Sequence, residues 1–306
     1  MRIAVMAAGA VGGYFGARLA AAGHKVAFIA RGAHRDAIAR DGLKVDSPLG
    51  DLHLKNVGVT DDPKQVASVD LVLFAVKLWD TETAGEATRP LIGASTRVIT
   101  LQNGVDSVER LLPILGDAAT IGGATYVVAK IASPGVIRHT GTAAKIRCGR
   151  LDRWADPLLH RYVDEMKAAG LDITLADDMR LDLWKKFVLL SGTSGATAGT
   201  RAPLGVIRDD PDMRAFLFRL MAETTAVGRA AGVAFPSDFE QELEQQVASF
   251  PPIMRASMAN DLEAGNRLEL DWLAGKVVAL GRKHGVPTPT HAAVYAMLKP
   301  YRMGRG

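Results

Sequence analysis

Cysteine is almost missing from this chain of 306 residues, in which Cys148 is the only one. A disulfide within the chain is therefore excluded, and a reducing compartment suits the sequence. We interpret the lone thiol as a small buried hydrophobe. Internal repeats, low-complexity tracts and long runs of one charge are also missing. Solenoid arrays and compositionally biased segments are thereby excluded.

Long apolar runs are missing too, since none approaches the roughly 20 residues of a membrane-spanning helix. The stretch up to Gly23 imitates a secretory signal, but five glycines interrupt it and Arg18 falls inside its apolar part. Neither feature belongs to the apolar region of a signal peptide. The sequence therefore predicts a soluble, cytoplasmic protein with no membrane partner.

Charge of one sign is not concentrated anywhere, although the net charge is +4. Nucleic-acid binding usually needs a basic stripe, so we exclude it, and the mild excess suits an anionic small molecule. The histidines lack the spacing of metal ligands, which predicts no metal site. We expect every one of them at the surface or in a loop: His24, His34, His53, His139, His160, His284 and His291.

The length and a 48% hydrophobic composition fit about two folded domains. Strand patterns occupy residues 2–6, 25–30, 43–45, 52–57, 70–76, 97–102, 119–128, 135–139, 144–148 and 171–175. Helical patterns alternate with them at 11–22, 34–40, 81–91, 105–112 and 157–169. Later patterns are almost wholly helical, at 179–191, 211–231, 237–248, 254–264, 270–284 and 288–299. This predicts an α/β fold: a doubly wound parallel Rossmann-type sheet in residues 1–177, then an all-helical domain in 178–306.

A glycine-rich loop lies between the first strand and the first helix. The dinucleotide-binding fingerprint is G-x-G-x-x-G, and here its second and third glycines are Gly9 and Gly12, with Ala7 in the first place. The second glycine lets the backbone approach a pyrophosphate, and the third lets helix and strand pack closely. Alanine at the first place should be tolerated if its φ stays negative. We predict that Gly9, Ala10, Val11 and Gly12 bind the cofactor; a plain strand–turn–helix is the alternative.

The second strand ends at Ala30-Arg31 without the acid that an NAD site usually places there. Arg31 offers a planar cation suited to a 2′-phosphate, with His34 and Arg35 close behind it. The sequence therefore predicts NADP(H) as the cofactor. The alternative is that Arg31 is a solvated residue at a strand end.

Two further polar residues follow strands of the predicted sheet, Lys77 after 70–76 and Asn103 after 97–102. Ligands of open α/β sheets bind beyond the carboxyl ends of the strands. Both residues are therefore candidates for cofactor and substrate binding. Lys77 is otherwise a surface lysine, and Asn103-Gly104 is otherwise a turn dipeptide.

The motifs together resemble those of the ketopantoate reductases (2-dehydropantoate 2-reductases) from residue 1 to about 299. The resemblance is carried by Ile3-Ala4-Val5, Gly9-Ala10-Val11-Gly12-Gly13-Tyr14-Phe15-Gly16, Ala30-Arg31-Gly32, Val76-Lys77, Leu101-Gln102-Asn103-Gly104-Val105, Trp184-Lys185-Lys186, Ser257-Met258, Asp261, Gly265, Glu269 and Asp271. It implies NADPH-dependent reduction of ketopantoate to pantoate, on the route to coenzyme A. It also implies a Rossmann domain followed by a helical domain, with the active site in the cleft between them.

The resemblance also assigns roles. It makes Lys186 the catalytic lysine, Glu269 the active-site glutamate, Ser257 a substrate-binding serine and Asn103 a residue for cofactor and substrate. A lysine can supply both charge and a proton as a ketone oxygen turns negative. The apolar neighbours of Lys186 should lower its pKa toward neutrality. Without the resemblance, Lys186 would be interpreted as a solvated lysine, and Glu269 as an acid opening the helix 270–284.

The chain departs from the family at several substrate positions. Asparagines expected four and eight residues after Lys186 are Leu190 and Ser194, and another expected three residues before Ser257 is Met254. Asn266 and Leu268 replace a basic residue and a threonine. Leucine and methionine cannot donate hydrogen bonds as an amide does, so substrate preference should change. Ser194 is expected to compensate in part as a substrate-binding residue.

Ketopantoate is the first substrate that we expect, and a more apolar or branched 2-oxo acid the second. Two alternatives stay open: a related hydroxyacid dehydrogenase of the Rossmann-plus-helical type, and a non-catalytic NADP(H)-binding protein. The expected partners are the small 2-oxo acid and, in a homodimer, a second copy of the chain.

Overall fold

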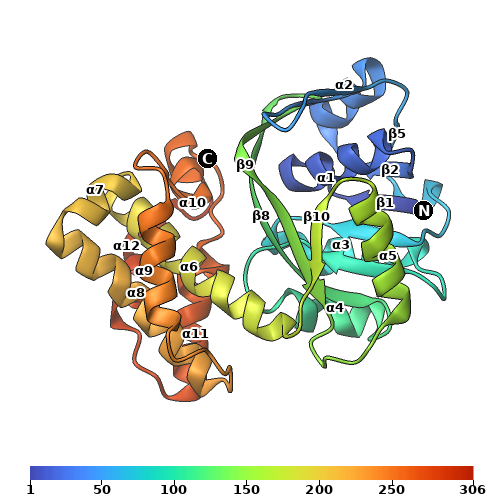
Figure 1. The fold of residues 1–306 in the computed structure, drawn as a ribbon. Helices are drawn as coiled ribbons and strands as arrows, with labels where there is room; N and C mark the ends of the chain where they lie inside the picture. Colours follow the sequence, from blue (N-terminus) through green and yellow to red (C-terminus); the bar gives the residue numbers. More distant parts are fainter. Residues whose placement is uncertain (306) are drawn as a thin grey trace. The chain divides into compact units, whose positions relative to one another are not determined.

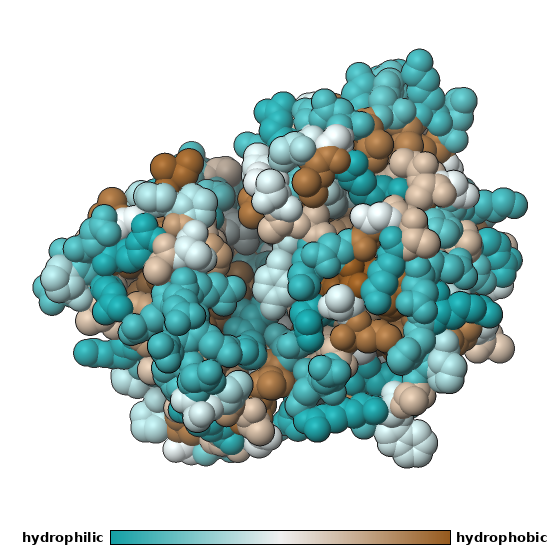
Figure 2. Space-filling view, viewed as in Figure 1, coloured by the Kyte–Doolittle hydropathy of each residue, from teal (hydrophilic) through white to brown (hydrophobic). Residues whose placement is uncertain are grey.

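The computed structural model describes residues 1–305. The chain divides into two compact units, Met1–Asp182 and a second from Leu183 onward, drawn in blue through green and in yellow through red in Figure 1. Within the described residues, no helix combines the length and apolar character needed to cross a membrane. Polar side chains cover most of the visible face in the space-filling view (Figure 2), and most large apolar side chains are buried.

The first unit is built on one sheet. Its strands are β1 (Arg2–Met6), β2 (Lys25–Ile29), β3 (Leu43–Asp46), β4 (Leu52–Leu54), β5 (Gly58–Thr60), β6 (Leu71–Phe74), β7 (Arg97–Thr100), β8 (Thr120–Ser133), β9 (Val136–Gly149) and β10 (Asp172–Leu175). Their order is β4-β3-β9-β8-β7-β6-β1-β2-β5, and β10 pairs with β9. The run β5-β2-β1-β6-β7-β8 is parallel throughout, which confirms the doubly wound part of the prediction.

Beyond β8 the sheet is mixed rather than parallel. The long strands β8 and β9 form an antiparallel hairpin (Figure 1). Strand β9 also runs parallel to β3 and β10, and β3 is antiparallel to β4. Only Pro134 and Gly135 separate the two long strands, and Gly135 has a φ of 77°. A Pro-Gly pair with positive φ at the second residue suits a tight turn. The segments predicted at 135–139 and 144–148 are therefore parts of one strand.

Helices cover both faces of the parallel region. They are α1 (Ala10–Ala21), α2 (Gly32–Asp41), α3 (Thr81–Thr88), α4 (Ser107–Leu115) and α5 (Pro157–Ala168), with short 3-10 turns η1 (Pro63–Gln65), η2 (Leu78–Asp80) and η3 (Arg89–Leu91). Ile3 and Val5 of β1 join a core with α1 and α5, whereas Ala4 and Met6 join a core with α3 and α4. The alternation follows from the two-residue repeat of a strand, and burial on both faces is typical of parallel sheets.

The second unit is helical, as predicted. Its elements are α6 (Met179–Thr200), which begins in the first unit, α7 (Leu204–Asp209), α8 (Pro211–Ala230), α9 (Phe239–Ser249), α10 (Ser257–Ala264), η4 (Leu270–Trp272), α11 (Ala274–His284), α12 (Pro289–Leu298) and η5 (Lys299–Tyr301). Helix α6 continues past the predicted end at 191, through Gly192, Gly195 and Gly199. A Cβ on Gly192 would lie 2.5 Å from Cγ of Met221 in α8, so a larger residue would force the Met221 side chain to shift.

Two histidines contradict the expectation that all seven lie at the surface or in loops. His139 is 2% exposed and His291 is fully buried. The His139 ring meets Oγ of Ser47 at 2.9 Å and the carbonyl of Ala143 at 3.0 Å. A buried imidazole is stable when hydrogen bonds replace water. Ser47 is distant in sequence from His139, so no local pattern could have revealed this.

Candidate active site

The carboxyl ends of four parallel strands lie in register at one edge of the sheet. Met6 at the end of β1 pairs with Ile29 of β2 and with Phe74 of β6, and Phe74 pairs with Thr100 of β7. The chain runs outward from β1 to β2 and returns on the other side as β6, so the strand order reverses at β1. Ligands of such sheets bind at this switch point. The segments that follow these strands carry the predicted residues Gly9, Arg31, Lys77 and Asn103.

The glycine loop has the two properties that a dinucleotide requires. A Cβ on Gly9 would meet no atom within 4 Å, whereas a Cβ on Gly12 would lie 2.6 Å from the carbonyl oxygen of Ala7. Gly9 therefore leaves room for a ligand against the backbone, and Gly12 lets α1 pack on β1. The first helical bond runs from N–H of Gly13 to the carbonyl of Gly9, at 2.8 Å. The N–H groups of Ala10, Val11 and Gly12 precede it at the positive end of the helix, which suits phosphate.

Ala7 contradicts the condition set from the sequence. Its φ is +67°, not negative. The first place of the loop therefore has the left-handed conformation that glycine adopts without cost, and alanine is held in it by its surroundings. The strain lies immediately before the residues that would contact the cofactor.

Arg31 follows β2, is exposed, and precedes the first residue of α2. Among residues 1–305 it forms no ion pair, whereas Arg35 pairs with Asp36 at 2.8 Å and Asp61 at 3.5 Å. The guanidinium of Arg31 is thus the one available for an added phosphate in this part of the described chain.

His34 joins this arrangement in a way that the sequence did not reveal. Its Nδ1 accepts a bond from N–H of Gly135 at 3.0 Å, and its Nε2 lies 3.0 Å from the carbonyl oxygen of Ala8. Because Nδ1 accepts, Nε2 carries the proton and donates it to Ala8. Burial lowers the pKa of His34, partly offset by the bond to Ala8. The neutral ring therefore ties the glycine loop to the turn between β8 and β9.

Lys77 and Asn103 extend the same edge. Lys77 is exposed directly after the segment that ends β6, and its Nζ lies 5.6 Å from the ring centroid of Trp79. Asn103 is half-buried after Gln102. Both residues lie where a parallel sheet of this kind usually binds its ligand, so they could contact a dinucleotide or the carboxylate of a substrate.

The second unit holds a shielded amine. Lys186 lies on α6, and its neighbours Trp184, Phe187 and Val188 are at most 5% exposed. The Lys186 Nζ is screened from solvent. Burial lowers the pKa of Lys186 to about 8, and the charge of Glu269 offsets part of this effect. An amine with a pKa near neutrality can give up or take a proton under working conditions.

Glu269 occupies a different local setting from the one expected. It does not open one long helix, because a 3-10 turn at Leu270–Trp272 follows it and α11 begins only at Ala274. Its side chain is 6% exposed. Glu269 still stands at a helix N-terminus, as the N-cap of this 3-10 turn, and its buried carboxylate is within electrostatic reach of Lys186.

The two predicted substrate serines lie in unlike surroundings. Ser257 is exposed at the first residue of α10. Ser194 is fully buried, and its Oγ has no hydrogen-bond partner in the described chain. Eight helical residues separate Ser194 from Lys186, which is about 12 Å along the axis. Lys186 and Glu269 interact electrostatically, and Ala256, which precedes Ser257, donates from its N–H to Oγ1 of Thr197 on α6 at 3.3 Å.

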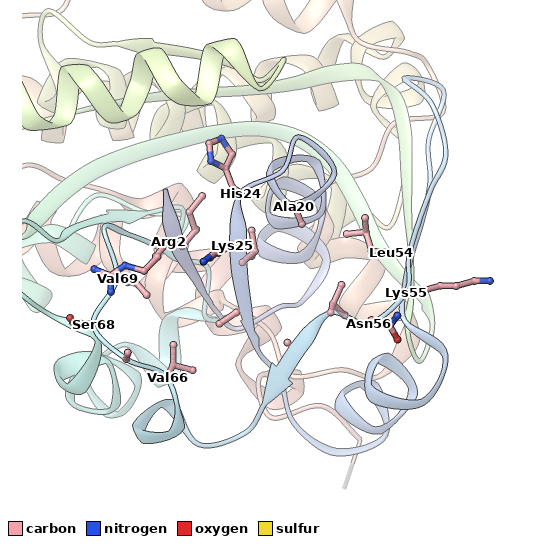
Figure 3. Close-up of a pocket in the computed structure, with 16 residues that line it drawn as sticks. Arg2, Ala20, His24, Lys25, Leu54, Lys55, Asn56, Val66, Ser68 and Val69 are labelled. Atoms are coloured by element: carbon pink, nitrogen blue, oxygen red, sulfur yellow. The ribbon is translucent and has the colours of Figure 1, made fainter.

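A surface hollow of about 490 Å³ lies elsewhere in the first unit. Arg2, Lys25 and Val69 line it, so it is at the amino ends of β1 and β2 (Figure 3). It is opposite to the edge that carries the candidate residues. No cluster of three or more His, Cys, Asp or Glu in residues 1–305 could hold a metal ion.

Comparisons with known proteins match the whole chain. The family model described as ketopantoate reductase PanE/ApbA matches residues 3–153, and that of the C-terminal part of the same family matches 178–302. The 2-dehydropantoate 2-reductase of Mesorhizobium japonicum is 30% identical, covering 100% of this chain and 99% of the relative. A PanE/ApbA family ketopantoate reductase from Ralstonia eutropha JMP134 has a TM-score of 0.89 at 33% identity, covering 99% of this chain and 98% of that chain.

A more distant structure shares the fold. A ternary structure of D-mandelate dehydrogenase with NADH and anilino(oxo)acetate has a TM-score of 0.90 at 19% identity, covering 99% of this chain and 98% of that chain.

Proposed function

The chain belongs to the ketopantoate reductase PanE/ApbA family, and on that premise we propose that it reduces the 2-oxo group of a small carboxylic acid with NADPH. The observation that carries the proposal is the buried amine of Lys186, with a pKa lowered to about 8 and the carboxylate of Glu269 acting on it. Reduction of a ketone needs such a proton donor, because negative charge develops on the oxygen.

The glycine loop fits a nicotinamide dinucleotide. The open space at Gly9 and the first N–H groups of α1 would hold the pyrophosphate. NADPH is favoured over NADH because β2 is followed by Arg31 and not by an acid that would bind a free 2′-hydroxyl. NADH is the alternative, and the D-mandelate dehydrogenase of similar fold was solved with NADH.

The protein's own groups have separable tasks in the proposed reaction. When bound, the reduced nicotinamide supplies the hydride that adds to the carbonyl carbon. Lys186 as an ammonium ion gives a proton from Nζ to the carbonyl oxygen, and the neutral amine then takes a proton from water. Glu269 favours the ammonium form before each turnover. Lys77 and Asn103 would bind the carboxylate and amide groups of the ligands. The products are a 2-hydroxy acid and NADP⁺.

Ketopantoate is the first substrate that we propose, giving pantoate. Leu190 lies one helical turn beyond Lys186 and so shares its face of α6. An amide expected there is replaced by an apolar side chain, and this favours a second candidate, a 2-oxo acid with an apolar or branched substituent.

The test is NADPH oxidation, followed by absorbance, with a panel of 2-oxo acids. We expect turnover with the wild type and a loss of at least about 100-fold with Lys186→Ala, the lower range for one proton donor. Lys185→Ala is the matched control, because the neighbouring Lys185 is bonded to Glu242 instead. No turnover of any 2-oxo acid by the wild type, or equal rates for Lys186→Ala, would contradict the proposal.

A further inference from the structure

Gln102 has a side chain whose polar atoms are all engaged although it lies in the loop after β7. The residue is 4% exposed. Its Nε2 donates to the carbonyl oxygen of Val76 at 3.2 Å and to Oγ1 of Thr81 at 2.8 Å. Its Oε1 accepts from Oγ1 of Thr100 at 3.1 Å. A glutamine amide offers two donor hydrogens and one acceptor oxygen. Both hydrogens and the oxygen of Gln102 therefore form hydrogen bonds.

These bonds join two strand ends that carry candidate site residues. Val76 directly precedes Lys77, and Gln102 directly precedes Asn103. Thr81 is the first residue of α3, and its Oγ1, which accepts from Gln102, in turn donates to the carbonyl of Leu78 at 2.9 Å. The backbone before Lys77 is therefore attached to Gln102 directly, and the backbone after Lys77 is attached to it through the hydroxyl of Thr81.

Few residues could replace this side chain. Leucine or methionine would leave the Val76 carbonyl without this buried donor, and an unsatisfied buried group is costly. Asparagine is one methylene shorter. An ionised glutamate keeps the shape but only accepts hydrogen bonds, so it would oppose the Val76 oxygen.

We propose that Gln102 is a positioning residue, which sets the spacing between Lys77 and Asn103 for the reduction. This inference rests on the proposed function, since it assumes that these two residues bind the reactants. Gln102 touches neither ligand in this account and acts only through the two neighbouring backbones. Groups that orient metal ligands from behind typically change affinity or activity by about 10- to 100-fold when altered, and we expect an effect of similar size here.

The experiment compares Gln102→Glu and Gln102→Met with the wild type in NADPH-dependent reduction. Both variants should lose about 10- to 100-fold in kcat/KM. A buried glutamate has a raised pKa, and once protonated it regains one donor. The activity of Gln102→Glu relative to wild type should therefore recover as the pH falls from about 8 to about 6, and that of Gln102→Met should not. Gln65→Glu, at an exposed glutamine of the same unit, is the control and should behave as wild type.

A second readout separates positioning from loss of structure. If Gln102 acts through Lys77, its effect should shrink in a Lys77→Ala background instead of multiplying with it. Should both Gln102 variants fail to fold by circular dichroism, Thr81→Val removes one of the same bonds and should lower kcat/KM in the same direction.

The outcomes are distinguishable. Wild-type turnover together with wild-type rates in the Gln102 variants, or in Thr81→Val if it is needed, would overturn the inference and leave the proposed function standing. Lost activity without recovery at lower pH, and with full multiplication by Lys77→Ala, would also overturn it. A wild type that turns over no 2-oxo acid would overturn both.

Discussion

Ala7 is held in a backbone conformation that alanine seldom adopts. At a φ of +67°, its Cβ crowds the following carbonyl, which costs roughly 1–2 kcal/mol for a side-chain-bearing residue. The segment is fixed on both sides: β1 ends at Met6, and N–H of Ala8 donates to the carbonyl of Ile29 at 2.7 Å. The strain therefore persists because the neighbouring bonds over-determine the turn.

Ala7→Gly should stabilise the protein by about 0.5–1 kcal/mol, because relief of the left-handed strain exceeds the added flexibility of the unfolded chain. Denaturant unfolding measures this directly. Ala8→Gly is the matched control, since Ala8 is buried without a positive φ, and it should lower stability. An Ala7→Gly protein no more stable than the wild type would contradict the strain.

Lys186 should give the reaction a pH dependence of defined sign. The ammonium donates the proton, so kcat/KM for reduction should fall as the pH rises through about 8, where the amine loses its charge. Oxidation of the hydroxy acid needs the neutral amine and should rise over the same interval. Glu269→Gln removes a charge that raises the pKa of Lys186, so the falling limb should move to lower pH. A limb that stays in place or moves upward would exclude Glu269 as the electrostatic partner.

Helix α1 is placed by glycines with different tasks. Gly12 has no room for a Cβ beside the carbonyl of Ala7, whereas the Cβ position of Gly9 is open. One glycine therefore belongs to the packing of α1 on β1, and the other to the space in front of the helix.

Gly12→Ala should destabilise the protein by about 1–3 kcal/mol through overpacking. Gly9→Ala should leave stability within roughly 0.5 kcal/mol of the wild type but weaken NADPH at least about tenfold by blocking the pyrophosphate. Thermal unfolding and cofactor titration together check this. The reverse order, with Gly9→Ala the less stable variant, would mean that the loop is packed differently.

The sequence predicted most elements because periodicity is a local property. It missed α7, whose six residues are too short to show a helical repeat, and it ended α6 early because Gly192 and Gly195 disfavour isolated helices. It also broke β9 into two pieces, since strand pairing in the hairpin is not local. Packing against α8 and pairing with β8 decided these cases.

For the candidate site, too, the sequence indicated which residues take part but not the long-range bonds that hold them. Strand ends, together with the family resemblance, indicated the residues at the carboxyl edge and the apolar setting of Lys186. The bond from His34 to Gly135 and those of Gln102 to Val76 and Thr81 join distant parts of the chain. The positive φ of Ala7 arises from the surrounding hydrogen bonds. No motif contains the bonds of His34 and Gln102, whereas the glycine that the fingerprint usually has at position 7 does point to a tight turn there.

At the scale of the molecule, the groups of the proposed reaction are divided between the two units. The first carries the glycine loop and Arg31, and the second carries the shielded amine with its carboxylate. A net charge of +4 suits the anionic cofactor and 2-oxo acid that we propose. The proposed function requires the first unit to select NADPH through a cation that pairs with the 2′-phosphate.

The most direct measurement is the dissociation constant of NADPH and of NADH for the wild type and for Arg31→Ala. We predict that the wild type prefers NADPH by at least about tenfold, as a charge-assisted bond implies, and that Arg31→Ala loses this preference with NADH binding unchanged. Arg40→Ala, at the other end of α2 where Arg40 is bonded to Asp41, should keep it. Equal wild-type affinities, or an Arg31→Ala variant that weakens both cofactors alike, would contradict the account.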